Sequence, residues 1–210
     1  GCEFIVDVRN GQKTGFYLDQ RNNRARVMAL SSAKTVLNCF SYTGAFGVCA
    51  AKGGAMRVVN VDSSASAMQM AEKNFKLNSI EPTKAEFIVE DAGRYLRKCR
   101  DSRCSFDMIV LDPPKFAESK SHVQGASRAY KDINLLAIKL LNPDGGLLFT
   151  FSCSGHIDPD LFQKIVASAG MDAGRCVKIL ERLGQSADHP VDINFPEGLY
   201  LKGLLCHVSS

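Results

Sequence analysis

The stretch TVLNCFSYTGAFGVCAAK, residues 35–52, decides the fold that this sequence predicts. Its first six residues, 35–40, form a short apolar run of the kind found in buried parallel strands. A turn containing Gly44 follows, and an alanine-rich stretch then predicts a helix that ends at about Lys52. A strand that passes through a glycine-containing turn into a helix is the first half of a βαβ unit.

The same alternation continues towards the C-terminus. Apolar runs predict six further strands, at 57–62, 85–91, 106–112, 146–152, 176–183 and 199–208. Helical spacing is clearest over 127–141, and Asp158-Pro159 is a good start for another helix. The last two strands have only a loop between them, so the final one should run antiparallel. We therefore predict an α/β fold: a doubly wound, mostly parallel seven-stranded sheet with an antiparallel last strand.

The N-terminal residues 1–30 predict a β-hairpin and a helix attached to this sheet. Residues 3–9 are extended, and Asn10-Gly11 favours the type I′ turn that joins tight hairpins. A second extended run reaches Tyr17, after which Asp19 is placed to cap a helix.

Composition is ordinary for a globular protein, with 45% hydrophobic and 23% charged residues. Residues 31–210 are enough for one domain with a substantial core, and no internal repeat or linker divides them. No apolar run is long enough to span a bilayer, and no secretory signal opens the chain. Because the chain begins without an initiator methionine, we expect it to be a fragment of a longer protein.

The net charge of +4 permits a polyanionic partner without requiring one. The eight cysteines include no CxxC pair and no Cys/His cluster at metal-ligand spacing. Several lie inside apolar runs, as free buried thiols do. We therefore expect no metal and a reducing, cytoplasmic compartment.

Acidic residues at the ends of predicted strands indicate a ligand site, because ligands of open α/β sheets bind beyond those ends. Asp62 comes about 20 residues after the glycine turn, the spacing of a carboxylate that accepts ribose hydroxyls. Asp91 is placed to accept an adenine amine, although either residue also suits a helix N-terminus. With no GxGxxG in residues 38–47, the dinucleotide fingerprint is absent. These residues suggest an adenosine-bearing cofactor.

The most specific motif is LDPPKF, residues 111–116, in which two prolines follow a strand-end aspartate. They stiffen the backbone beside Asp112 and remove two N–H groups, so the carboxylate is held at a fixed place. The next strand delivers Cys153, which should face the same pocket. The thiol is either a small buried hydrophobe or a nucleophile. For Lys115 and Phe116, contacts with phosphate and base stand beside a solvated lysine and a packed phenylalanine.

Taken together, the motifs resemble class I S-adenosylmethionine-dependent methyltransferases, which have a Rossmann-like fold. Within that class, NCFSYTGAFGVCA, LDPPKF, YKDINLLAIKLLNPDGG, FSCSG and ADHPV…FPEGLYLKG resemble the bacterial 23S ribosomal RNA cytosine-C5 methyltransferases. The resemblance covers essentially the whole chain, including GFYLDQR, and implies large-subunit ribosomal RNA as the partner. The sequence departs from that family by lacking the N-terminal PUA domain. It also carries Lys115 where many other RNA cytosine-C5 enzymes have a second cysteine.

The resemblance implies Cys153 as the nucleophile and Asp112 as the second catalytic residue. It implies that S-adenosylmethionine is held by the glycine turn, the strand ends and the residues before the first long helix, namely Gln20, Arg21, Asn38, Phe40, Ser41, Tyr42, Thr43, Gly44, Asp62, Ser63, Asp91, Ala92, Asp112 and Pro113. Substrate contacts are expected at Lys115, Phe116, Arg128, Tyr130 and Lys131, of which the last three follow the loop that leaves the active-site strand. The basic segment 94–103 is more typical of a solvated helix face.

Three functions stay open at this point. The first is an RNA cytosine-C5 methyltransferase, and the second is a methyltransferase of another specificity, such as a guanine nitrogen, which needs no thiol. The third is a non-catalytic RNA-binding or assembly module, against which the intact aspartates and Cys153 argue. No residue is assigned as the base that removes the C5 proton. Asp188 and His189 are candidates, but a histidine before proline is more often structural.

Overall fold

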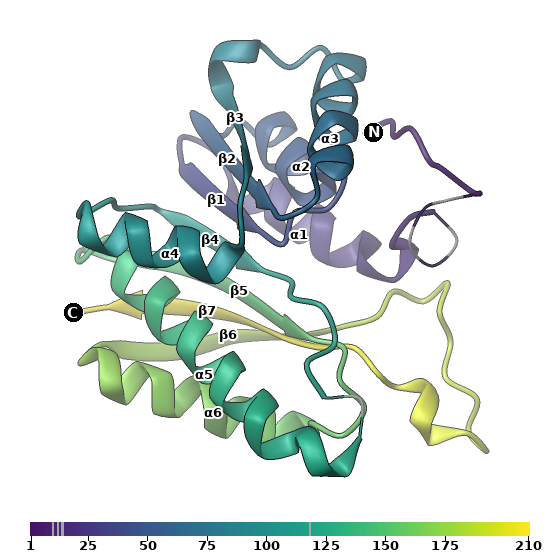
Figure 1. Ribbon diagram of the computed structural model, residues 1–210, viewed down its shortest axis with the longest axis vertical. Helices are drawn as coiled ribbons and strands as arrows, with labels where there is room; N and C mark the ends of the chain where they lie inside the picture. The colour runs from purple at the N-terminus through teal and green to yellow at the C-terminus, as the bar shows by residue number, and fades with distance from the viewer. Residues whose placement is uncertain (10, 12, 14, 118) are drawn as a thin grey trace.

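The computed structural model describes residues 1–210 except 10, 12, 14 and 118, and its centre is one seven-stranded sheet (Figure 1). The strands lie in the order β3-β2-β1-β4-β5-β7-β6. Their bounds are β1 Thr35–Cys39, β2 Arg57–Asp62, β3 Ala85–Val89, β4 Met108–Leu111, β5 Gly146–Ser152, β6 Cys176–Gly184 and β7 Lys202–Ser209. Strands β1 to β5 pair in parallel, and β7 pairs antiparallel with both β5 and β6. The predicted sheet is thus confirmed.

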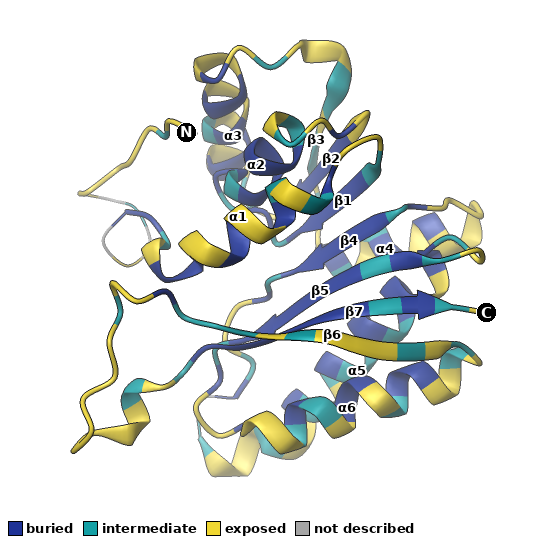
Figure 2. Ribbon diagram, turned by 180° about the vertical axis from the view of Figure 1, so that it is seen from behind, coloured by how far each residue is buried: buried dark blue, intermediate teal, exposed yellow. Residues whose placement is uncertain are grey.

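Helices cover both faces of the sheet (Figures 1 and 2). They are α1 Arg21–Leu30, α2 Ala45–Lys52, α3 Ala65–Leu77, α4 Ala92–Asp101, α5 Val123–Leu140 and α6 Pro159–Ala173, with short 3-10 turns at Leu18–Gln20, Pro82–Lys84, Lys120–His122 and Pro196–Gly198. Alternate residues of each strand pack into two hydrophobic cores, one on each face of the sheet, because successive side chains point to opposite faces. Val36 packs in the core of α1, α2 and α3, whereas Leu37 packs in that of α4, α5 and α6. Among the described residues, no helix combines the length and hydropathy needed to cross a bilayer.

The predicted N-terminal hairpin is wrong for the residues that the structure describes. No strand is assigned between residues 1 and 17, and Asn10 of the predicted turn lies outside the described residues. The backbone N–H groups of Glu3 and Ile5 instead donate to the side-chain oxygens of Asn78 and Asn74, at 2.9 and 2.8 Å. Because these α3 side chains satisfy the backbone, the segment has no need of a strand partner.

Asp19 does not cap a helix either. It lies in the 3-10 turn before α1, whose N-cap position is occupied by Gln20 without a side-chain capping bond. The Asp19 carboxylate is buried and accepts hydrogen bonds at 2.6 Å from Lys13 and from Tyr200. An aspartate drawn into tertiary contacts of this kind is unavailable to the helix terminus. The predicted cap at Asp158 is confirmed, since its side chain accepts the N–H of Leu161.

Candidate active site

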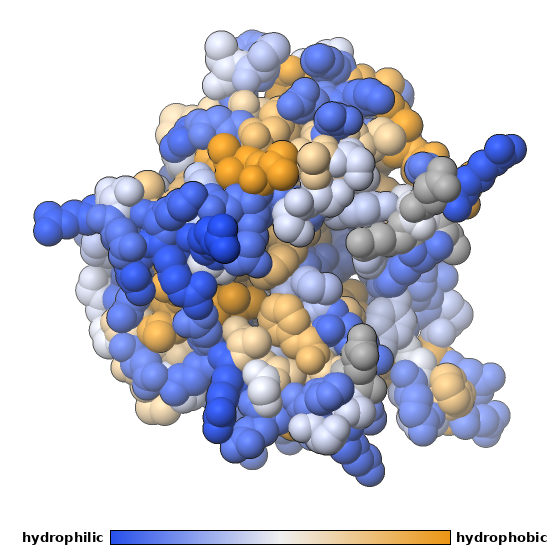
Figure 3. Space-filling model, viewed as in Figure 1, coloured by the Kyte–Doolittle hydropathy of each residue, from blue (hydrophilic) through white to orange (hydrophobic). Residues whose placement is uncertain are grey.

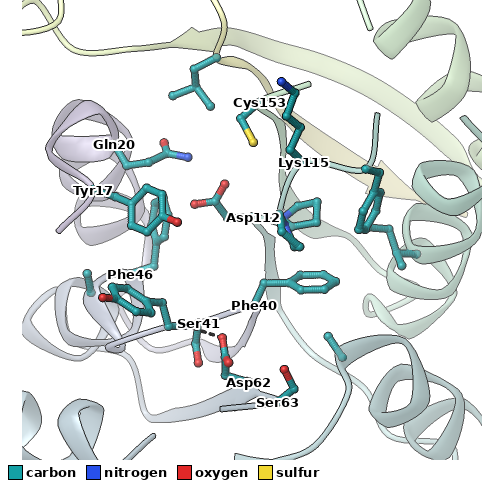
Figure 4. A pocket seen from close by; sticks show the side chains of 18 of the residues that line it. Tyr17, Gln20, Phe40, Ser41, Phe46, Asp62, Ser63, Asp112, Lys115 and Cys153 are labelled. Atoms are coloured by element: carbon teal, nitrogen blue, oxygen red, sulfur yellow. Dashed lines mark hydrogen bonds between the residues drawn. The ribbon is translucent and has the colours of Figure 1, made fainter. Parts of the chain in front are cut away.

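A cavity of about 830 Å³ opens at the carboxyl ends of the parallel strands (Figure 4). The turns after β1, β2, β4 and β5 supply one side of it. The N-terminal segment supplies another side through Tyr17 and Gln20, and Tyr200 and Leu201 before β7 complete the wall. The cavity therefore lies where ligands of open α/β sheets bind.

The turn after β1 is tightly wound. Phe40, Tyr42 and Gly44 all have positive φ, at 57°, 47° and 77°. A Cβ added at Gly44 would lie 2.9 Å from the Cβ of Ala71 on α3, so both the conformation and the space require glycine. The Tyr42 N–H donates to Asp62 at 2.8 Å, which ties this turn to the end of β2. The turn is thereby held close to α3 and to the end of β2.

The far end of the cavity suits an adenosine. Asp62 and Ser63 point into it (Figure 4), and Asp91 and Ala92 line it from the start of α4. Asp91 also caps α4 by accepting the N–H of Arg94 at 2.8 Å, so the capping interpretation of this residue is seen in the structure. Among the described residues, the buried Thr43 hydroxyl oxygen has no hydrogen-bond partner, which leaves it available to a ligand.

Not every expected cofactor contact lies on this cavity. Asn38 is buried beneath it and donates to Asn60 at 3.0 Å, and Gly44 shapes the turn without lining the space. Arg21 points to Asp188, at 3.4 Å, on the outside of the wall. Gln20, Phe40, Ser41, Tyr42, Thr43, Asp62, Ser63, Asp91, Ala92, Asp112 and Pro113 do line the cavity.

Cys153 and Asp112 border the same part of the cavity (Figure 4). Strands β4 and β5 are parallel neighbours, with Leu111 paired to Thr150, so the residues that follow them emerge side by side. Cys153 is partly exposed, unlike the fully buried Cys206, so its sulfur is not a core thiol. The geometric condition for a nucleophile is therefore met.

The surroundings of Asp112 and Cys153 have opposing effects on the pKa values of both groups. Burial, and then the negative charge of Asp19, raise the pKa of Asp112 to about 7, and a hydrogen bond from Gln20 opposes the rise. Burial also raises the pKa of Cys153, and Asp112 raises it further, while Lys13 and Lys202 act to lower it. The thiolate is therefore favoured by its lysine neighbours and by a backbone hydrogen bond, against the effects of burial and Asp112.

A buried hydrogen-bond network supports the turn that carries Cys153. The Ser154 hydroxyl accepts the N–H groups of Phe116 and Ala117, both at 3.2 Å, and lies 3.1 Å from the Tyr130 hydroxyl. The Ser152 hydroxyl donates to Tyr130 at 3.0 Å. The network joins the loop after β4, which begins at Asp112, to the turn after β5, which carries Cys153.

The structure places the residues expected to contact substrate in three different environments. Lys115 and Phe116 line the cavity, but Tyr130 is fully buried in the network just described, so the expectation that it contacts substrate is wrong. Arg128 and Lys131 border a separate shallow groove between α5 and α6, and Lys131 pairs with Asp172 at 2.8 Å.

The basic segment 94–103 on α4 is a hydrophilic surface in Figure 3. Its side chains pair with neighbouring carboxylates, as Arg97 does with Asp132 and Lys98 with Glu90. These contacts agree with the interpretation of a solvated helix face. Among the described residues, no group of three or more potential metal ligands gathers, and all eight cysteines are free.

The family model for S-adenosylmethionine-dependent methyltransferases matches residues 1–206. The chain belongs to this family. The cofactor of this methyltransferase is S-adenosylmethionine, and the glycine turn, Asp62 and the available Thr43 oxygen fit its adenosine.

Relatives agree with this assignment. The methyltransferase is 56% identical over 208 residues to "Ribosomal RNA large subunit methyltransferase I" of Cronobacter sakazakii, covering 99% of this chain and 52% of that protein. The protein of the same name from Aeromonas salmonicida is 58% identical over 205 residues, covering 98% and 52%. A crystal structure of a putative methyltransferase complexed with SAH superposes with a TM-score of 0.88 at 27% identity, covering 99% of this chain and 54% of that one. The chain spans about half the length of the curated relatives it matches.

Several residues on the methyltransferase cavity were missed by the sequence analysis. They come from the N-terminal segment, α1, α2 and the approach to β7, and are Lys13, Phe16, Tyr17, Asp19, Arg24, Phe46 and Tyr200. The signal that would have found the first group is the motif GFYLDQR, which carries aromatic, acidic and basic residues together. Asp188 and His189 do not line the cavity and bond to each other at 3.2 Å, so neither is placed as a base.

Proposed function

We propose that this chain is the catalytic part of a methyltransferase that acts on C5 of a cytosine in 23S ribosomal RNA, with Cys153 as its nucleophile. The observation that carries the proposal is the shared position of the Cys153 sulfur and the Asp112 carboxylate on one cavity. Curated relatives more than half identical to this chain are named as methyltransferases of large-subunit ribosomal RNA, which supports the substrate class.

The thiol answers an electronic problem of the substrate. Cytosine C5 is too weak a nucleophile to take a methyl group directly. Addition of the Cys153 thiolate to C6 forms an S–C6 bond and moves the ring electrons so that C5 becomes an enamine carbon. S-adenosylmethionine supplies the methyl group. Loss of the C5 proton to a base then restores the ring double bond and expels the thiolate, so that Cys153 returns unchanged.

Asp112 has a protonation state suited to this addition. With a pKa of about 7, its carboxyl is partly protonated at neutral pH. A neutral acid can donate a hydrogen bond to cytosine N3, where negative charge develops as the thiolate adds. Pro113 and Pro114 fix the loop so that this side chain keeps its place beside the sulfur. Because the target base must leave its stack to reach the cavity, an extruded nucleotide is the expected substrate form.

The proposal is tested by trapping a covalent complex of the intact protein with ribosomal RNA that carries 5-fluorocytidine. Fluorine cannot leave C5 as a proton does, so Cys153 should remain bonded to C6 and the complex should survive a denaturing gel. Cys153→Ala should form no complex and reduce methyl transfer to background. Cys176→Ala, which removes an exposed cysteine far from the cavity, is the matched control and should behave as the wild type.

Two results would contradict the proposal. Full methyl transfer by Cys153→Ala would favour a chemistry without a thiol, such as transfer to a guanine nitrogen. Failure of the wild type to bind S-adenosylmethionine in calorimetry would favour a non-catalytic module.

A further inference from the structure

Lys202 is a buried lysine behind the proposed nucleophile. It is the first residue of β7 and pairs with Ser152, the last residue of β5, in the antiparallel ladder. On its other side it pairs with Gly184 of β6. Only 9% of Lys202 is exposed. Its position in the ladder carries its side chain to the turn that presents Cys153.

Among the described residues, the hydrogen-bond partners of the Lys202 ammonium are two backbone carbonyls. It donates to the carbonyl of Ser154 at 2.6 Å and to that of Tyr200 at 2.8 Å. Within the described part of the chain, no carboxylate comes within 4 Å of this nitrogen. Buried lysines are normally paired with an anion, because an isolated buried charge is costly. The two carbonyl dipoles compensate only part of that cost, so an anion close to the Lys202 ammonium would stabilise its charge further.

A group beside this turn that can become an anion is Cys153. Ser154, whose carbonyl Lys202 holds, is the next residue in the chain. Burial lowers the pKa of Lys202 to about 8, while the negative charges of Cys153 and Asp158 raise it and Lys115 lowers it. The other charged groups that act on the thiol are Asp112, which opposes its ionisation, and Lys13, which favours it. Lys202 is thus a buried cation that is hydrogen-bonded to the residue directly after Cys153.

We propose that Lys202 is the positioning residue of the nucleophile: its ammonium holds the turn after β5 through Ser154 and stabilises the thiolate form of Cys153. This inference rests on the proposed role of Cys153 as the group that adds to the substrate. A merely structural lysine would hold the two carbonyls without affecting the charge of the thiol. The two roles differ in one measurable property, the ionisation of Cys153.

The test measures the rate of alkylation of Cys153 by iodoacetamide across pH 6 to 10, followed peptide by peptide in mass spectrometry so that the other cysteines do not interfere. Lys202→Gln keeps a hydrogen-bond donor of similar length but removes the charge. Its Cys153 should ionise at higher pH, so that alkylation at pH 7.5 is several-fold slower than in the wild type. Lys178→Gln, on the exposed face of β6, is the matched control and should leave the profile unchanged.

Lys202→Arg provides a second, independent variant should the glutamine chain fail to fold. Arginine keeps its charge at every pH tested, so Cys153 should ionise at the same pH as in the wild type or lower. An upward shift in the arginine variant, or an unchanged profile in a folded glutamine variant, would overturn the proposal. Because alkylation needs neither RNA nor methyl transfer, its outcome is separate from that of the 5-fluorocytidine experiment.

Discussion

At the scale of single residues, environment gives the two strand-end aspartates of the cavity different properties. The Asp62 carboxylate accepts the backbone N–H groups of Tyr42 and Ser64, at 2.8 and 2.9 Å, which fix its position. Asp112 is instead confined near the charge of Asp19, and its pKa rises to about 7. One carboxylate is therefore suited to hold ribose hydroxyls, and the other to exchange a proton near neutral pH.

This difference predicts a pH-dependent stability change for Asp112→Asn. Because the pKa of Asp112 rises on folding from 3.8 to about 7, the folded protein retains a proton that the unfolded chain releases between those values. The contribution of this carboxyl to the free energy of unfolding thus falls as pH rises from about 4 to 7. Asparagine does not titrate, so Asp112→Asn does not lose stability in this way as the pH rises.

Urea denaturation should show Asp112→Asn to be more stable than the wild type by about 4 kcal/mol at pH 8, with the gain disappearing towards pH 4. Asp144→Asn, at an exposed carboxylate, should change stability little at either pH. A gain for Asp112→Asn that is equal at pH 4 and pH 8 would contradict the raised pKa.

At the scale of elements, the turn between β1 and α2 depends on Gly44, and Gly125 in α5 offers a matched comparison. Gly44→Ala forces a side chain into a left-handed conformation and into Ala71, so we expect a loss of about 2 kcal/mol and weaker binding of S-adenosylhomocysteine. Gly125→Ala meets no atom within 4 Å on a helix and should gain about 0.5–1 kcal/mol. Urea denaturation and calorimetry measure both. A neutral Gly44→Ala would show that the turn tolerates a Cβ.

The elements that sequence reasoning predicted well are those with a strong local pattern. Strands 57–62 and 146–152 have the predicted bounds, because continuous apolar runs bounded by turns leave little choice of register. The expected neighbouring positions of strands 106–112 and 146–152 then placed Cys153 beside Asp112. The hairpin failed because its backbone groups bond to Asn74 and Asn78, about seventy residues away, and local pattern contains no trace of such a contact.

Residues of the site were missed for the same reason. Asp19 lines the cavity where the chain returns at Tyr200, whose hydroxyl donates to it, and local pattern does not show this distant contact. Tyr130 was assigned to the substrate surface because it follows the loop that leaves the active-site strand, and position in the chain does not show which side of a helix is covered. Its burial follows from the packing of α5 on the turn after β5.

At the scale of the whole molecule, the two ends of the chain close the cavity that the sheet opens. The N-terminal segment contacts α3 through Ile5 and then lines the cavity through Lys13, Phe16 and Tyr17. The approach to β7 meets it there, through the contact of Tyr200 with Asp19. The predicted division into 1–30 and 31–210 stays a proposal, but the contacts show that the first part contributes to the site of the second.

Asn74 is the residue through which this arrangement can be tested. It is fully buried on α3, where its side-chain oxygen accepts the N–H of Ile5 at 2.8 Å and its amide donates to the carbonyl of Thr43 at 2.9 Å. The Asn74 side chain therefore connects the N-terminal segment to the glycine turn after β1. Asn74→Ala leaves buried backbone groups unpaired and should cost about 2 kcal/mol in the free energy of unfolding.

We expect Asn74→Ala to speed hydrogen exchange in both the N-terminal segment and the turn at 40–44, and to weaken S-adenosylhomocysteine binding. Asn78→Ala is the matched control, because Asn78 bonds to Glu3 but not to the turn. It should loosen the N-terminal segment and leave affinity near that of the wild type. If both variants lose affinity equally, the segment acts on the cavity as a lining wall, and the bond from Asn74 to Thr43 has no part in holding the turn for its ligand.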